Sequence, residues 1–119
     1  MREKSPDRSV ERVDKRYATG YSLLVVIRTF AHKGLQRLYT DGIAKGVPPE
    51  TVDKLRKMFA FLDAMSTANE LRTLPTWKAH LLTGDRKGTW SLSVTRNLRL
   101  TFWIDEEVRL CDINLEDYH

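Results

Sequence analysis

Residues 89–115, TWSLSVTRNLRLTFWIDEEVRLCDINL, decide the fold. Apolar and polar side chains alternate through this stretch, and two short polar breaks interrupt it, TRN at 95–97 and DEE at 105–107. A period of two is typical of β-strands that bury one face, and such breaks are typical of turns. We therefore predict three consecutive antiparallel strands, at 89–94, 98–104 and 108–115.

The alternation also assigns side chains to the two faces of the sheet. In the second strand one face carries Leu98, Leu100, Phe102 and Ile104, and the other carries Arg99, Thr101 and Trp103. In the first strand Trp90, Leu92 and Val94 alternate with Thr89, Ser91 and Ser93. The apolar face therefore needs a covering layer, and the polar face can stay open to water.

That layer is predicted in residues 47–65, VPPETVDKLRKMFAFLDAM. Pro49 and Glu50 suit the first turn of a helix, and an apolar stripe follows at steps of three and four, formed by Val52, Leu55, Phe59 and Leu62. Shorter elements are predicted as a helix in 31–40, an extended segment in 21–30, a capped helical turn in 66–71 and a strand in 76–82. The order indicates an α+β fold, a small antiparallel sheet with two α-helices packed on one face.

The chain has 119 residues, enough for one domain, which we place at residues 21–119. Residues 1–20 are mostly charged without a sustained apolar face, and we expect a disordered or frayed extension there.

The longest apolar run, LLVVI at 23–27, is far too short to span a membrane, so no membrane partner and a cytoplasmic location are expected. Cys111 is the only cysteine, and no His/Cys cluster has zinc spacing, so we expect neither metal nor cofactor.

Charge is divided along the predicted sheet. Residues 72–99 contain six cations and one acid, a net charge of +5, whereas residues 100–119 contain one cation and six acids, a net charge of −5. This division is unlike a uniform nucleic-acid footprint and resembles a local phosphate site beside a group of carboxylates.

Five candidate site residues lie on or at the ends of the predicted strands: His80, Arg99, Asp117, Tyr118 and His119. Metal-free RNA cleavage needs proton transfer at the 2′-hydroxyl and at the leaving 5′-oxygen, together with a cation for the charged intermediate. Histidine and arginine suit these tasks. Each residue also has an ordinary interpretation: a surface histidine, a solvated arginine, or an edge tyrosine. The residues alone indicate a domain with a basic patch, for which action on a phosphate is one possibility.

Three segments together resemble a known family: residues 28–65 with their GVPPE helix start, HLLTGDRKGTWSLSVTRNLRLTFWI at 80–104, and the closing EDYH. They are similar to the HigB-type toxins of bacterial toxin–antitoxin systems, in the RelE superfamily of messenger-RNA interferases. The resemblance covers residues 26–119. Because valine can be encoded by the bacterial start codon GTG and the resembling proteins begin near Val26, we expect residues 1–20 to be dispensable.

The resemblance implies a function and partners. Such toxins are endoribonucleases that cleave messenger RNA, generally in the ribosomal A site, and inhibit translation. A helix-turn-helix, HigA-like antitoxin from the same operon silences them, and operator DNA is reached only through it. By resemblance the catalytic residues are His80, Arg99, Asp117, Tyr118 and His119. The candidate RNA-binding residues are Lys78, Thr83, Arg86, Lys87 and Arg96.

Two positions depart from the family pattern. Thr83 stands where the family usually has a phosphate-contacting lysine, and Leu98 stands where it commonly has tryptophan. Two outcomes stay open for the missing charge at Thr83: compensation by Lys78, Arg86 or Lys87, or weaker activity. Two non-enzymatic alternatives stay open: a toxin that poisons DNA gyrase by binding it, and a degraded toxin retained mainly as a DNA-binding or antitoxin-binding module. The complete Asp-Tyr-His ending favours the nuclease.

Overall fold

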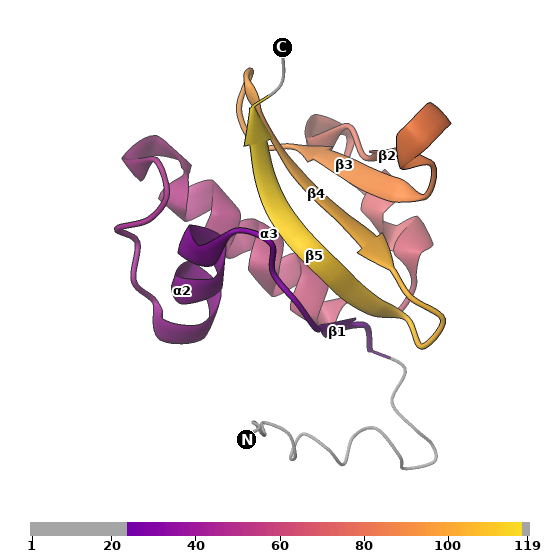
Figure 1. Cartoon of the computed structure of the whole chain (residues 1–119), viewed down its shortest axis with the longest axis horizontal. Helices are drawn as coiled ribbons and strands as arrows, with labels where there is room; N and C mark the ends of the chain where they lie inside the picture. Colours follow the sequence, from indigo (N-terminus) through magenta and orange to yellow (C-terminus); the bar gives the residue numbers. More distant parts are fainter. Residues whose placement is uncertain (1–23, 118–119) are drawn as a thin grey trace.

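The computed structural model describes residues 24–117, which form a five-stranded sheet with strand order β1-β5-β4-β3-β2 (Figure 1). The strands are β1 (Val26–Ile27), β2 (His80–Leu81), β3 (Thr89–Ser93), β4 (Leu98–Ile104) and β5 (Arg109–Asp117). The three strands predicted within residues 89–115 are confirmed, and β3 and β5 both pair with β4 in antiparallel fashion. They form the centre of the sheet.

Both edge strands differ from the prediction. β1 runs parallel to β5, with Val26 beside Arg109, so the sheet is mixed rather than wholly antiparallel. The strand predicted at 76–82 is reduced to β2, because η3 (Pro75–Trp77) forms a 3-10 turn before it. Trp77 is buried in the core and packs edge-on against Phe61 at 5.3 Å between ring centres, so this part of the chain cannot stay extended.

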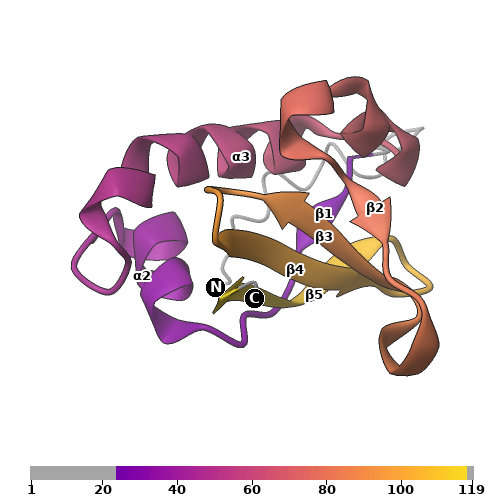
Figure 2. The same ribbon diagram turned by 90° about the horizontal axis from the view of Figure 1, so that it is seen from above.

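Two α-helices supply the covering layer. α3 (Val52–Ala64) follows the 3-10 turn η1 (Pro49–Thr51) and lies along one face of the sheet, and α2 (Lys33–Asp41) packs against α3 and β5 (Figure 2). The predicted stripe is confirmed at Leu55, Phe59 and Leu62, which are buried. The capped turn predicted at 66–71 is η2 (Ala68–Thr73), in which the Glu70 carboxylate accepts from the Thr67 backbone N–H at 2.9 Å.

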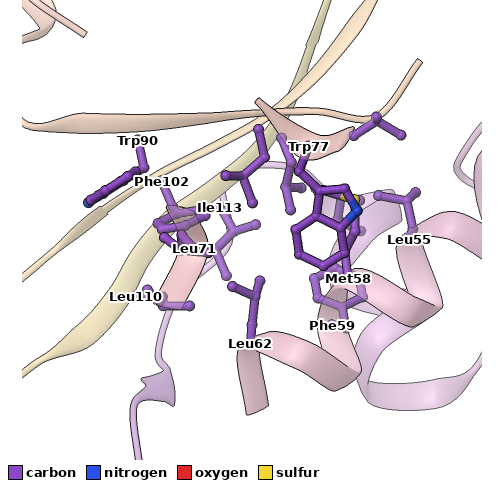
Figure 3. Packing of buried hydrophobic residues seen from close by; sticks show 14 of the residues in the cluster. Leu55, Met58, Phe59, Leu62, Leu71, Trp77, Trp90, Phe102, Leu110 and Ile113 are labelled. Atoms are coloured by element: carbon purple, nitrogen blue, oxygen red, sulfur yellow. The ribbon is translucent and has the colours of Figure 1, made fainter. Parts of the chain in front are cut away.

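The core lies between α3 and the apolar face of the sheet (Figure 3). Leu100 and Phe102 of β4 are at most 1% exposed, whereas Trp103 on the opposite face is 40% exposed, as the alternation predicts. An irregularity between Thr101 and Trp103 shifts the register against β5. Within residues 24–117, no helix combines the length and the apolar character required to cross a membrane.

The start of α2 is fixed by close contacts. The Nδ1 atom of His32 accepts from the Leu35 backbone N–H at 3.0 Å and so caps the helix. Gly34 follows, where a side-chain Cβ would lie 2.2 Å from the carbonyl oxygen of Gly46. Only glycine therefore fits where the loop after α2 returns to the start of the helix.

Candidate active site

The strand register brings two rows of polar residues to the face opposite α3. In the first row, His80 pairs with Ser91, and Ser91 pairs with Thr101. In the second row, Arg99 pairs with Ser93 on one side and with Glu116 on the other. Residues directly opposite in neighbouring strands point to the same face. His80, Arg99 and Glu116 therefore share one face of the sheet.

His80 is exposed on the edge strand β2. Its Nδ1 atom lies 3.1 Å from the carbonyl oxygen of Lys78, a residue in the left-handed conformation with φ 49°. A carbonyl oxygen can only accept, so Nδ1 carries the hydrogen when this bond forms. The other ring nitrogen, Nε2, is then left for proton exchange with a substrate.

Arg99 is half-buried near the β3–β4 turn. Its Nη1 atom donates a hydrogen bond to the hydroxyl oxygen of Ser93, its partner across the hairpin. The bond holds the side chain along the polar face. A guanidinium fixed in this way can stabilise negative charge that develops above the sheet.

Arg86 and Thr101 anchor the carboxylate of Glu116 on this face. Both of its carboxylate oxygens accept from Arg86, at 2.8 and 2.6 Å, and the Thr101 hydroxyl donates to one of them at 2.5 Å. The Arg86 hydrogen bonds are the main reason that the pKa of Glu116 lies below its ordinary value. The Thr101 and Asn114 hydrogen bonds add to this shift, against the effect of burial. Sequence reasoning missed this residue, although the alternation of Ile113 and Leu115 already placed Glu116 on the polar side.

The candidate RNA-binding residues lie in three places, of which Lys78 occupies the segment just before β2. Thr83, Arg86 and Lys87 lie at or beside η4 (Gly84–Arg86), in the loop between β2 and β3, whereas Arg96 lies in the β3–β4 turn. In the described part of the chain Lys78, Lys87 and Arg96 are exposed and none of them forms an ion pair, whereas Arg86 is engaged with Glu116.

Arg72 differs from the other cations of residues 72–99. Its guanidinium lies 4.9 Å above the ring of Trp90, which is 5% exposed and belongs to the core. Arg72 therefore lies on the helix side of the sheet, and the cations of this basic segment are not all on one face.

Asp117 is the last described residue, and Tyr118 and His119 lie outside the described residues. Asp117 is exposed and pairs with Leu98, so the alternation places it in the phase of Leu98 rather than of Arg99. The register brings His80 and Arg99 to one face and places Asp117 at the adjacent strand end, in the opposite phase. The five-residue catalytic site remains a prediction.

A pocket of about 400 Å³ lies away from these rows, at the β4–β5 turn. It is lined by Trp103, Ile104, Asp105, Glu106, Glu107 and Arg109. Burial alone would raise the pKa of Asp105, but hydrogen bonds from Arg109 and from the Glu107 backbone outweigh it and lower the pKa overall. Three acids at the pocket repel phosphate, so it is not suited to an RNA backbone.

Comparison with known proteins identifies the class. Residues 28–119 match the family described as RelE-like toxin of type II toxin-antitoxin system HigB. Endoribonuclease HigB from Proteus vulgaris is 38% identical over 95 residues, which cover 79% of this chain and 100% of that protein. The chain therefore belongs to the HigB-like toxins, and the predicted family is confirmed. The predicted enzyme class, endoribonuclease, is also the activity given in the name of this relative.

Solved structures of other toxins are also similar. The YoeB/ParE toxin from Agrobacterium tumefaciens aligns with a TM-score of 0.47 at 17% identity, over 80% of this chain and 100% of that one. A chain of the toxin-antitoxin complex RelBE2 from Mycobacterium tuberculosis aligns with a TM-score of 0.42 at 18% identity, over 81% of this chain and 99% of that one.

Proposed function

We propose that this toxin inhibits translation by cleaving messenger RNA on the ribosome. The observation that carries the proposal is the placement of His80 and Arg99 on one face of the sheet, with Nδ1 of His80 turned to the Lys78 carbonyl oxygen. A proton-transfer group and a fixed cation on one face supply two of the three groups that metal-free phosphodiester cleavage requires. The family match and the named endoribonuclease relative support the same reaction.

In the proposed reaction, a base removes the proton of the ribose 2′-hydroxyl, whose oxygen attacks the neighbouring phosphorus. Arg99 stabilises the extra negative charge of the intermediate. The bond to the 5′-oxygen then breaks, and an acid protonates this leaving oxygen. His80 performs one of the two proton transfers, and the Asp117, Tyr118 and His119 end supplies the other.

Binding of RNA and partners completes the proposal. Lys78, Thr83, Arg86, Lys87 and Arg96 contact messenger or ribosomal RNA. A HigA-like helix-turn-helix antitoxin silences the toxin in the cytoplasm, and operator DNA is reached only through that antitoxin. Membership of a toxin–antitoxin family supports the antitoxin partner.

The test is to induce the toxin alone in a bacterium and map the 5′ ends of messenger RNA. We expect cuts in phase with codons. These cuts should be absent for His80→Ala and retained for Arg37→Ala on α2. DNA damage without cuts would instead indicate gyrase poisoning. Normal growth without cuts would indicate a degraded relative, and either of these outcomes refutes the nuclease.

A further inference from the structure

We propose that Glu116 is a positioning residue that ties the β2–β3 loop, through Arg86, to the sheet face carrying Arg99. This tie, the contact between Glu116 and Arg86, sets where Arg86 meets RNA beside the sheet face that carries His80 and Arg99. This inference rests on the proposed RNA cleavage and adds a residue for which the resemblance implies no role.

The contact between Glu116 and Arg86 fixes orientation as well as distance. Two terminal nitrogens of the guanidinium meet two carboxylate oxygens, at 2.8 and 2.6 Å, across 30 residues of sequence. A bidentate pair of this kind holds both planar groups in one relative arrangement. The loop therefore has a defined position over the sheet as long as the pair is intact.

Glu116, the anchor, is held by its strand pairing and by a neighbouring side chain. Glu116 lies in β5, where its backbone pairs with Arg99, and its side chain is 27% exposed. The Thr101 hydroxyl, on a residue only 4% exposed, donates to the carboxylate that receives Arg86. Glu116 thus places Arg86 relative to Arg99, its own partner across the strands.

The loop needs this tie because it has little else to hold it. No residue of η4 is buried. Two backbone hydrogen bonds hold the loop: the Leu82 N–H donates to the Thr89 carbonyl oxygen at 2.8 Å, and the Lys87 N–H donates to the Gly84 carbonyl oxygen at 3.1 Å. Within residues 24–117, Arg86 forms the loop's ion pair with the sheet, and neither Asp85 nor Lys87 forms one. Segments with few buried contacts open readily.

Arg86 can still contact RNA while it is tied. Its side chain is 48% exposed, and a guanidinium has five N–H donors, of which the pair with Glu116 uses two. The remaining donors suit a phosphate oxygen. The tie thus presents a pre-aligned cation, which reduces the ordering that RNA binding must otherwise impose.

The experiment compares Glu116→Gln, Arg86→Ala and the double variant in the full chain. Glu107→Gln is the matched control, because it removes an exposed ion pair of 3.0 Å with Arg109 at the β4–β5 turn. We expect Glu116→Gln to raise KM for cleavage on programmed ribosomes by about tenfold, the effect of one misaligned charge-assisted contact. The kcat should stay within about twofold, and the double variant should be no worse than Arg86→Ala alone.

Limited trypsin digestion gives a second measurement that needs no RNA. Glu116→Gln should speed cleavage after Lys87 by about tenfold, and Glu107→Gln should leave it unchanged. If wild-type protein cuts no messenger RNA but digestion responds as expected, the proposed function fails and the tie stands. Three outcomes would overturn the proposal. The first is a normal digestion rate in Glu116→Gln, and the second is a lower KM in this variant, which would mean that the carboxylate competes with phosphate for Arg86. The third is additive effects of the two substitutions in the double variant.

Discussion

Removing residues 1–20 should leave the domain folded, whereas removing residues 1–25 should destabilise it. The difference comes from Val25, which is 2% exposed and whose backbone N–H donates to the Met65 carbonyl oxygen at 2.7 Å. Val25 precedes the start of the family match at residue 28. A truncation designed on the resemblance alone would therefore remove part of the core.

The expected loss follows from these two contacts. Burial of a valine side chain contributes about 1.5–3 kcal/mol, and a backbone hydrogen bond contributes about 1 kcal/mol net. The free energy of unfolding should thus fall by about 2.5–4 kcal/mol. In a domain of this size each 1 kcal/mol corresponds to about 4–8 °C, so the Tm should fall by at least about 10 °C.

The assay is urea unfolding followed by tryptophan fluorescence, with His80→Ala in every variant so that the toxin can be produced. Val25→Ala in the full-length chain is the control and should cost less than the longer truncation, because it keeps the hydrogen bond to Met65. Equal midpoints for the two truncations would show that the Val25 contacts contribute nothing. Unfolding of the shorter truncation would show that residues 1–20 belong to the fold.

Three further predictions concern single residues. Arg99→Ala should lower the rate of messenger-RNA cleavage by about 10²–10³-fold, as loss of one preorganised donor does, while Arg37→Ala on α2 should match wild type in the same kinetic assay. Asp105→Asn should be less stable than wild type at neutral pH. Because the folded pKa of Asp105 lies below its ordinary value, this difference is present above about pH 4 and disappears as pH falls through the folded pKa in an unfolding series. Gly34→Ala should lower the free energy of unfolding by about 1–3 kcal/mol in urea, because its Cβ would meet the Gly46 carbonyl oxygen at 2.2 Å.

The alternation of apolar and polar residues predicted the central strands, because a strand that packs on the core must place its apolar side chains on one face. A shift of one residue in β4 would move Leu100 and Phe102 from the core to water and bring Arg99 inside. The same argument fixes α3, where Leu55 and Leu62 must face the sheet. These parts of the fold are encoded locally, and Arg99 inherits its face from them, whereas the face of His80 depends on the pairing of the edge strand β2 with β3.

Long-range partners could not be predicted in this way. A periodic pattern says which face a side chain occupies but not which residue it meets. The parallel pairing of Val26 with Arg109 joins segments from the two ends of the domain. The bond between Arg86 and Glu116 joins a loop to a strand across 30 residues. Both depend on the assembled sheet.

The cations of residues 72–99 differ in what their loss should do to the salt dependence of binding. Lys87 is exposed in the β2–β3 loop, whereas Arg72 lies over Trp90 on the helix side. Each cation that neutralises an RNA phosphate releases counterions and contributes about 0.7 to the slope of log K against log salt. Lys87→Ala should therefore flatten the slope for binding to programmed ribosomes by about this amount, and Arg72→Ala should leave it unchanged although both remove one charge. Equal slopes for wild type and Lys87→Ala would place the RNA surface elsewhere, with the Lys54–Lys57 part of α3 as the next region to test.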